Sequence, residues 1–272
     1  MRLTQARIRK FQTMILTWWK THRRDLPWRK THDPYKILVS EIMLQQTQVS
    51  RGLPKYIEFL EVFPTVEKLA GAKTSSVLRI WKGMGYNRRA LYLQNTAKKV
   101  VLDYNGIFPN TEQQLTTLSG VGKYTARAIM VFAFAIDIAV VDTNIRQIIT
   151  HFFFDDAPQP EKSIQEVADQ LMPKGKAWEW HQALMDYGAI ALERNEKRSI
   201  KKKSKPFKET NRYFRGRLLD LVYEKQWKEA DLMSEMVKKF GKDKEFMEEI
   251  INGMSKDGLI VCSKTGIISL PE

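Results

Sequence analysis

The sequence predicts a mostly α-helical protein with a small α+β unit at its C-terminal end. Apolar residues recur at three- and four-residue spacing almost everywhere before residue 258, and alternating strand patterns are missing there. The stretch 258–272, GLIVCSKTGIISLPE, instead holds two short apolar runs around a Lys-Thr-Gly turn. With 272 residues, 43% of them hydrophobic, the chain is long and apolar enough for one main helical domain and a small appendage.

The helices of the larger domain follow from apolar periodicity and from capping residues. Asp33 and Pro34 pair an N-cap residue with proline at the first helical position, so a helix is expected from there to about Val49. The apolar run 128–141 is interrupted by an aspartate and is too short to cross a bilayer, which predicts a buried helix and a turn. Periodicity predicts further helices at 5–20, 54–62, 65–70, 75–81, 87–103, 111–117, 123–135, 143–153, 161–172 and 178–192.

The C-terminal unit differs in character from the rest. Three short helices are predicted at 209–225, 228–240 and 243–256, ahead of the two strands. Three helices followed by a β-hairpin resemble a winged helix. We therefore predict a helical domain at 1–193, a basic linker at 194–208 and a winged-helix-like domain at 209–272, where the alternative is a small domain that only packs against its neighbour.

The net charge of +14 and the sequence pI of about 9.7 favour a polyanionic partner, with nucleic acid ahead of an anionic membrane. The segment 194–217 holds eleven Lys or Arg residues and two Glu, so most of the surplus is concentrated there. We interpret Lys201, Lys202 and Lys203 as contacts to a phosphate backbone, against the alternative of a solvated basic face.

Cys262 is the only cysteine, which excludes an intramolecular disulfide and any cluster that needs several thiolates. This usage fits a reducing cytosol. The N-terminal stretch is basic, but its apolar run is short and no small-residue cleavage site follows, so no signal peptide is predicted. We expect a cytoplasmic protein.

The stretch LSGVGKYTARAI at 118–129 predicts a turn between two helices, a hairpin spanning 111–135. Gly120 and Gly122 permit backbone angles closed to other residues and let the main chain approach a ligand closely. The turn leads into a helix N-terminus, whose free N–H groups and dipole attract an anion, and Lys123 adds a positive charge. We predict a helix-hairpin-helix that binds a DNA phosphate, where the alternative is a turn used only for packing.

This hairpin, followed by VVDTNIRQ at 140–147, resembles the helix-hairpin-helix DNA glycosylase superfamily. The resemblance implies a two-lobed fold for 1–193, with Asp142 as the catalytic carboxylate and Asn144 as its support. Asp142 also precedes a predicted helix, so N-capping is its structural alternative. The two roles are compatible, because a carboxylate held by backbone N–H groups stays ionised and can stabilise an oxocarbenium-like transition state.

Tyr124 stands where the superfamily's glycosylase/lyases carry the lysine that forms a Schiff base with the sugar. A phenol cannot form that imine. Lys123 is one position away and points about 100° elsewhere on a helix. The resemblance therefore implies an enzyme that cuts the glycosidic bond and leaves the strand intact, with Tyr124 hydrogen-bonding near the Asp142–Asn144 pair.

Four further stretches narrow the subfamily: DLPWR (25–29), DPYKILVSEIMLQQTQV (33–49), GMGYNRRA (83–90) and ALMDYGAI (183–190). Together they resemble the A/G-specific adenine glycosylases, the MutY family, over about residues 10–192. The resemblance implies removal of adenine opposite 8-oxoguanine or guanine, by flipping the base out of the duplex. The expected partner is double-stranded DNA with a mismatch or lesion, bound by a monomer at the nucleoid.

Glu41 is predicted to be the general acid. Its neighbours three and four positions away on the helix are mostly apolar: Ile37, Leu38, Leu44 and Gln45. Such surroundings desolvate a carboxyl group, which raises its pKa and keeps it protonated near neutral pH. The resemblance assigns this glutamate to protonation of the departing adenine, and the structural alternative is a buried glutamate paired with an arginine.

The resemblance also assigns residues to the extruded base and to the gap that it leaves. Gln46 and Tyr86 are the wedge that enters the duplex around the lesion opposite the target, and Gln45 lies beside them, one to two helical turns beyond the acid. The expected lining of the adenine pocket is Leu26, Trp28 and Arg29, although the aliphatic and indole side chains suit an ordinary core equally well.

The chain departs from the family in several places. The family carries four cysteines for an iron–sulfur cluster, and the corresponding positions here are Leu192, Ser199, Lys202 and Lys208. No cluster is therefore expected, and a monovalent cation at the hairpin is the only ion that the resemblance leaves. The family's C-terminal domain, which helps to verify 8-oxoguanine, is replaced by the winged-helix-like unit, so recognition of that lesion is in doubt. Thr143 and Asn87 replace a glycine and an aromatic residue.

Two other functions compete with adenine removal. A T/G or U/G mismatch glycosylase of the same superfamily can share GVGKYT and the glutamate, but typically lacks MLQQTQV and the tyrosine of GMGY. A non-catalytic DNA-binding protein, with the winged unit as its reader, is the second alternative. We disfavour it because Glu41, Tyr124 and Asp142 have no joint use in a pure binder.

Overall fold

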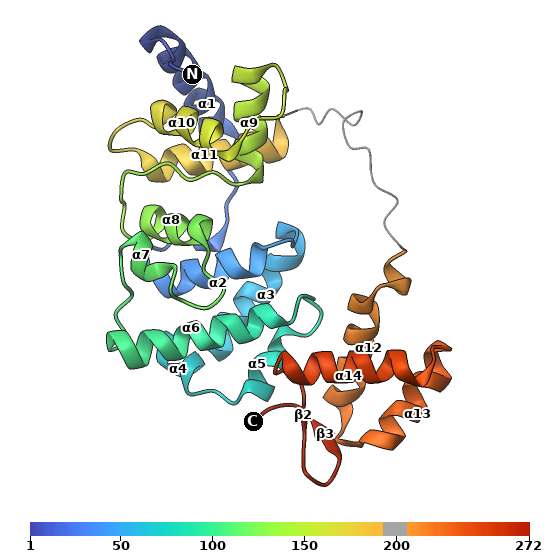
Figure 1. Cartoon of the computed structure of the whole chain (residues 1–272). Coiled ribbons are helices and arrows are strands. Elements are labelled where there is room, and N and C mark those ends of the chain that lie inside the picture. Colours follow the sequence, from blue (N-terminus) through green and yellow to red (C-terminus); the bar gives the residue numbers. More distant parts are fainter. Residues whose placement is uncertain (193–205) are drawn as a thin grey trace. The chain divides into compact units, whose positions relative to one another are not determined.

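The computed structural model describes residues 1–192 and 206–272, and the protein is mostly helical there, as predicted (Figure 1). Most of the predicted linker 194–208 lies outside the described residues, as do Ser199, Lys201, Lys202 and Lys203, so their assignments stay predictions. Among the described residues we find no helix that combines the length and the apolar character needed to cross a bilayer.

Contacts group the described residues into two compact units. The first contains residues 1–41 and 108–192, and the second contains 42–107 and 206–272. The predicted division at residue 193 follows chain order, whereas the contacts place the helices of 42–107 with the C-terminal domain. Within the second unit, two distant parts of the chain line one cavity.

The core of the first unit lies among four helices. Helix α1 (Gln5–His22) buries Phe11 and Ile15 against α10 (Glu161–Leu171) and α11 (Ala177–Ile190), and α9 (Thr143–Phe154) packs on the same two helices. The Phe11 ring meets the Trp180 ring edge-on, with 5.9 Å between centroids. The unit also holds η1 (Pro27–Arg29), most of α2 (Pro34–Leu44), α7 (Glu112–Leu115) and α8 (Lys123–Phe132).

The second unit begins with helices whose apolar faces meet around Trp81 and Phe59, both fully buried. Helix α6 (Arg88–Tyr104) packs against α4 (Val66–Ala70) and α5 (Thr74–Trp81), and α3 (Val49–Val62) packs against α5. The Thr65 hydroxyl caps α4 by accepting from the backbone N–H of Lys68.

The predicted helix 34–49 is shorter than expected, and a new helix begins within it. Helix α2 ends at Leu44, and α3 begins at Val49, five residues before the predicted start. Gln46 adopts a left-handed conformation with φ 54°, which no α-helix can contain. Gln45 and Gln46 therefore lie in a turn between two helices, and the prediction that the helix of Glu41 continues through them to about Val49 is wrong.

The C-terminal domain has the predicted winged-helix order with one added strand. Helices α12 (Asn211–Glu224), α13 (Glu229–Phe240) and α14 (Lys244–Lys256) precede β2 (Val261–Cys262) and β3 (Ile267–Ser269). The short β1 (Trp227–Lys228) pairs with β3, which gives an antiparallel sheet in the order β1-β3-β2 within the described residues. A two-residue strand leaves no detectable alternation, which is why periodicity missed it.

Candidate active site

An ion pair holds the two helices of the predicted hairpin together. Arg127 Nε on α8 donates to Glu112 Oε2 on α7 at 2.6 Å, and the buried Val121 anchors the turn between them. Gly120 has φ 74°, so the expectation of a glycine-only conformation is confirmed there. The turn ends at the exposed N-terminus of α8.

Gly122 needs no special backbone angle. It is the N-cap of α8 with φ −86° and ψ 178°, an extended conformation open to any residue, so that part of the prediction is wrong. A Cβ atom added at Gly122 would meet nothing within 4 Å, and Gly120, Gly122 and Lys123 are all exposed. The main chain at this helix N-terminus is therefore accessible to a ligand, which the anion-binding prediction requires.

Asp142 is the N-cap of α9, as its position in the sequence predicts. Its Oδ1 accepts from the backbone N–H of Ile145 at 2.7 Å, and its Oδ2 accepts from Asn144 Nδ2 at 3.1 Å. The two oxygens are thus oriented by separate donors. Asn144 thus helps to orient the carboxyl group of Asp142.

His181 fixes the segment that leads into Asp142, and sequence reasoning missed it. The backbone N–H of Val140 donates to His181 Nε2 at 2.8 Å, so the other ring nitrogen, Nδ1, carries the proton and donates to the Ala177 carbonyl at 2.6 Å. Burial lowers the pKa of His181 to about 4, so the ring is neutral at physiological pH. Nothing in the sequence distinguished this histidine from one that only fills the core.

Gly188 explains part of the ALMDYGAI motif. A Cβ atom at Gly188, on α11, would lie 2.8 Å from Asn144 Cβ and 3.3 Å from Asn144 Cα. Helix α11 can therefore approach the first turn of α9 only with glycine at this position. The motif serves the placement of Asn144, and through it Asp142.

We expect Gly188→Ala to destabilise the protein by about 1–3 kcal/mol, because the added methyl group pushes on a backbone atom that cannot rotate away. Any activity that depends on Asp142 should fall together with stability, since the first turn of α9 must shift. Urea unfolding and single-turnover kinetics measure the two effects. Gly71→Ala is the matched control, because its Cβ would make only an ordinary 3.5 Å contact, and a variant at Gly188 that behaves like this control would contradict the assignment.

Glu41 has the desolvated environment that its helical neighbours predict. Its pKa is raised to about 7: burial is the largest cause, a hydrogen bond with Tyr124 opposes it, and the charge of Asp142 adds to the rise. Part of its side chain remains accessible. Among the described residues its hydrogen-bond partner is this hydroxyl, whereas the structural alternative required an arginine.

Tyr124 hydrogen-bonds Glu41 through its hydroxyl group, and it lies close enough to Asp142 for that charge to act on it. Burial raises the pKa of Tyr124 well above its ordinary value, and the charges of Glu41 and Asp142 add to the shift. The phenol consequently stays protonated. It acts as a neutral donor that orients the acid.

The carboxyl group of Asp142 is under two opposing influences. Burial raises its pKa, and the hydrogen bonds from Ile145 and Asn144 lower it. The capping bonds alone would have kept the pKa low, as the sequence suggested, so burial is the effect that sequence reasoning missed. Because the charge of Asp142 acts on Glu41, whose pKa is about 7, Glu41 is the group that keeps its proton while Asp142 is ionised.

The residues predicted to line the base pocket divide into two kinds. Leu26 and Trp28 are buried, which fits a pocket wall and a core equally. Arg29, in contrast, is used in an ion pair: its two terminal nitrogens contact the Asp186 carboxylate at 2.7 and 2.8 Å, and Arg24 Nε contacts the same carboxylate at 2.5 Å. Arg29 thereby holds η1 to α11, and its position favours a structural role over contact with a base.

The wedge residues belong to the second unit, where an arginine holds both of their turns. Gln46 and Tyr86 have left-handed backbones, with φ 54° and 47°, which is unfavourable for residues other than glycine. The buried Arg89 donates to the carbonyl oxygen of Gln45 at 2.5 Å and to that of Gly85 at 3.1 Å. Sequence reasoning missed Arg89, although it lies within the GMGYNRRA stretch.

Arg89 also explains the early end of α2. It donates to the carbonyl oxygens of Ile42 and Met43 at 3.0 and 2.9 Å, which have no partner within the helix once the chain turns. Burial lowers the pKa of Arg89 to about 10, so the guanidinium stays charged and interacts favourably with the helix C-terminus. A contact from α6 thus defines the turn that carries Gln46.

Comparison with known proteins places these residues in a wider group. Residues 39–174 match the family described as HhH-GPD superfamily base excision DNA repair protein. The adenine DNA glycosylase of Mycolicibacterium smegmatis is 35% identical over 230 residues, which cover 76% of this chain and 78% of that protein. The adenine DNA glycosylase of Buchnera aphidicola subsp. Baizongia pistaciae is 37% identical over 194 residues, which cover 70% of this chain and 55% of that protein.

A solved structure gives a similar result. A thermostable thymine-DNA glycosylase superimposes with a TM-score of 0.66 at 35% identity, over 70% of this chain and 90% of that one. The family match includes Glu41, Tyr124 and Asp142 but ends before the winged-helix-like domain. The family match therefore gives no information about that domain.

Proposed function

Because the chain belongs to the HhH-GPD superfamily of base excision DNA repair proteins, we propose that it is a monofunctional DNA glycosylase that removes mispaired adenine, opposite 8-oxoguanine or guanine, from double-stranded DNA. The observation that carries this proposal is the group of Glu41, Tyr124 and Asp142. It combines a carboxylic acid that stays protonated to about pH 7 with an oriented carboxylate. These are the two groups that hydrolysis of a purine nucleoside needs.

The reaction follows from their chemistry. Glu41 donates its proton to a ring nitrogen of the flipped adenine, and the electron pair of the C1′–N9 bond passes to the purine as the bond breaks. The negative charge of Asp142 stabilises the oxocarbenium ion that forms at C1′. Water then adds to C1′ and loses a proton to the ionised carboxylate of Glu41, which restores the acid and leaves an abasic site.

The strand should remain intact after this step. The position of the lyase lysine holds Tyr124, whose phenol forms no imine, and Lys123 is exposed at the N-terminus of α8. The proposal includes no iron–sulfur cluster, since the sequence has one cysteine, Cys262, and its only candidate ion is a monovalent cation at the hairpin. A monomer acting at the nucleoid in the cytoplasm completes the proposal.

A panel of mismatched duplexes tests it. We expect adenine to be released opposite 8-oxoguanine or guanine, with strand cleavage only after added alkali and no protein–DNA adduct on treatment with borohydride. A trapped adduct would overturn the monofunctional assignment. Equal or faster release of thymine opposite guanine would overturn the choice of adenine.

Removal of thymine or uracil opposite guanine is the second candidate, and the similarity to a thymine-DNA glycosylase structure favours it. Two features support adenine instead. An acid with a pKa of about 7 suits a purine leaving group, because adenine has ring nitrogens that accept a proton. The MLQQTQV and GMGY stretches, with Gln46 and Tyr86, are the elements that the thymine enzymes typically lack.

A further inference from the structure

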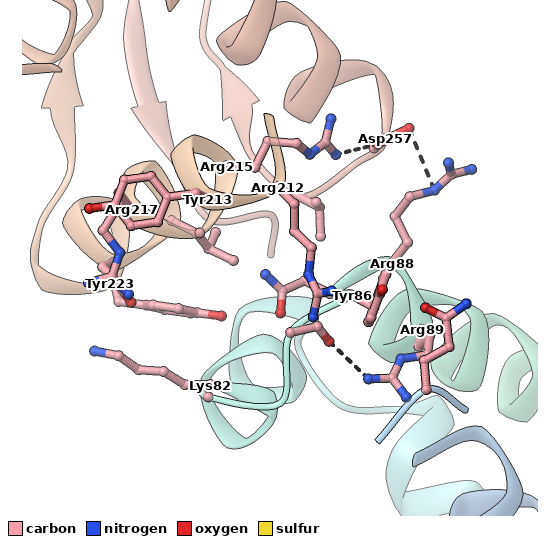
Figure 2. Close-up of a pocket in the computed structure, with 18 of the residues that line it drawn as sticks. Lys82, Tyr86, Arg88, Arg89, Arg212, Tyr213, Arg215, Arg217, Tyr223 and Asp257 are labelled. Atoms are coloured by element: carbon pink, nitrogen blue, oxygen red, sulfur yellow. Dashed lines mark hydrogen bonds and ion pairs between the residues drawn. The ribbon is translucent and has the colours of Figure 1, made fainter. Parts of the chain in front are cut away.

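The second unit contains a cavity of about 750 Å³ that the catalytic residues do not use. Its walls come from the turns before α3 and α6 and from α12 of the winged-helix-like domain, as Figure 2 shows. Five aromatic side chains line it, together with seven cationic side chains and two carboxylates. The cationic residues are Arg51, Lys82, Arg88, Arg89, Arg212, Arg215 and Arg217.

The two carboxylates are both occupied by arginines. Asp257 forms ion pairs with Arg215 and, at 3.6 Å, with Arg88, and the dashed lines in Figure 2 mark these contacts. Asp220 pairs with Arg217 at 2.9 Å. The cavity therefore keeps an excess of positive charge.

Arg212 contributes directly to this excess of positive charge. Among the described residues it has no carboxylate within ion-pair distance. Its guanidinium instead lies 3.6 Å from the centroid of the Tyr86 ring, a cation–π contact, and Figure 2 shows the two side chains next to each other. Arg89 also lies near this ring, 5.5 Å from its centroid, and the charge of Arg212 contributes to the lowered pKa of Arg89.

The placement of Arg212 is built into the fold. A Cβ atom at Gly85 would lie 3.1 Å from Arg212 Nη2, so a glycine makes room for the guanidinium. Tyr223 at the other end of α12 is buried, and its hydroxyl donates to the Leu78 carbonyl at 2.8 Å. Arg79 Nη1 donates to the Tyr223 carbonyl at 2.7 Å. The domain is thus docked on α5 by buried hydrogen bonds, with its basic helix over the cavity.

The recognition helix that winged-helix domains commonly insert into DNA is poorly suited to binding DNA in this domain. That helix is the third, α14, whose exposed side chains include Glu245, Glu248 and Glu249 against two lysines. A negative surface is repelled by phosphates. The arginines of the domain gather instead on α12, at the cavity.

We propose that this cavity binds a nucleotide unit of the DNA duplex, with Arg212 as its central contact, so that the winged-helix-like domain binds DNA through α12. The cavity has the size of small-molecule sites, about 300–1,000 Å³, which accommodates one nucleotide. Its aromatic rings offer stacking surfaces for a base, and its unpaired cations suit phosphate oxygens. This inference deepens the proposed function, because Gln46 and Tyr86 line the same cavity.

The test measures equilibrium binding to a short fluorescent duplex, mismatched or fully paired, by anisotropy at several salt concentrations. We expect Arg212→Ala to weaken binding about tenfold and to reduce the salt slope by about one unit. Arg212→Lys keeps the charge but loses the planar guanidinium group, so its affinity for the duplex should lie between that of wild type and that of Arg212→Ala. The matched control is Lys238→Ala, which removes an exposed cation of α13 outside the cavity and should change affinity less than twofold.

The possible results distinguish a failure of the nucleotide site from a failure of the proposed glycosylase function. Wild-type affinity of both Arg212 variants, or an equal loss in the Lys238 variant, would overturn the nucleotide site. Competition with free dGMP tests the source of the nucleotide: tight Arg212-dependent binding of dGMP with unchanged duplex affinity would overturn DNA as the occupant. If no mismatch is processed but duplex binding depends on Arg212, the proposed function fails and this inference stands.

Discussion

Asp142→Asn should abolish adenine release while the fold and the affinity for DNA stay nearly unchanged. Asparagine caps helices as well as aspartate does, so the hydrogen bond from Ile145 and the start of α9 are retained. The substitution removes the negative charge that is proposed to stabilise the oxocarbenium ion, together with the acceptor for Asn144 Nδ2. We expect the single-turnover rate to fall by about a thousandfold or more. Thermal unfolding and anisotropy binding measure the properties that should not change.

Asp243→Asn is the matched control for this variant. Asp243 is also an N-cap aspartate, whose carboxylate accepts from the backbone N–H of Phe246 at 2.7 Å on α14. The same chemical change at this cap should leave the rate of base release untouched. A wild-type rate for Asp142→Asn, or the same loss in both variants, would show that the charge of Asp142 has no catalytic role.

Glu41→Gln should also remove activity, by about 10²–10⁴-fold, because an amide donates no proton to the leaving purine. The wild-type rate should fall as the pH rises through about 7, where Glu41 loses its proton. The variant should lack this limb of the profile. Glutamine still accepts a hydrogen bond from Tyr124, so the local arrangement is preserved.

The same substitution should raise stability at alkaline pH. The pKa of Glu41 is about 7 in the folded protein and about 4.5 in the unfolded chain, so its contribution is fully present below pH 4.5 and is lost as the pH rises through 7. Glutamine has no such loss. We therefore expect Glu41→Gln to gain about 1–3 kcal/mol relative to wild type between pH 4.5 and 8, measured by urea unfolding at both values.

Glu61→Gln provides the comparison, because Glu61 is an exposed glutamate of α3. Its substitution should change neither the pH profile nor the relative stability at the two pH values. Should Glu41→Gln keep the alkaline fall in rate, another group would have to be the acid.

Several elements were predictable because their causes are local. Asp142 and Asp33 cap helices through side chains that act within three residues. Gly120 takes the left-handed conformation that its place in a turn predicts. The raised pKa of Glu41 follows from apolar neighbours one turn away on α2, and the three-helix and hairpin order of the C-terminal domain follows from periodicity alone.

Other features depend on contacts between distant segments, and local pattern does not contain them. The helix predicted through Val49 stops at Leu44 because Arg89, from α6, binds the carbonyl groups that the turn exposes. Arg29 was expected in a base pocket, but it pairs with Asp186 on α11. His181 is neutral because the fold buries it and presents it with the N–H of Val140.

The amino-acid sequence by itself determined the helical class, the hairpin, the desolvated Glu41 and the helix cap at Asp142, since these arise from periodicity, capping and neighbours within one helical turn. Only the tertiary structure decided how they are held. Gly188 lets α11 reach Asn144, and Arg89 holds the turns of Gln46 and Tyr86. It also decided that Arg212 lies on Tyr86, because 126 positions of chain separate two side chains that only packing brings within 3.6 Å.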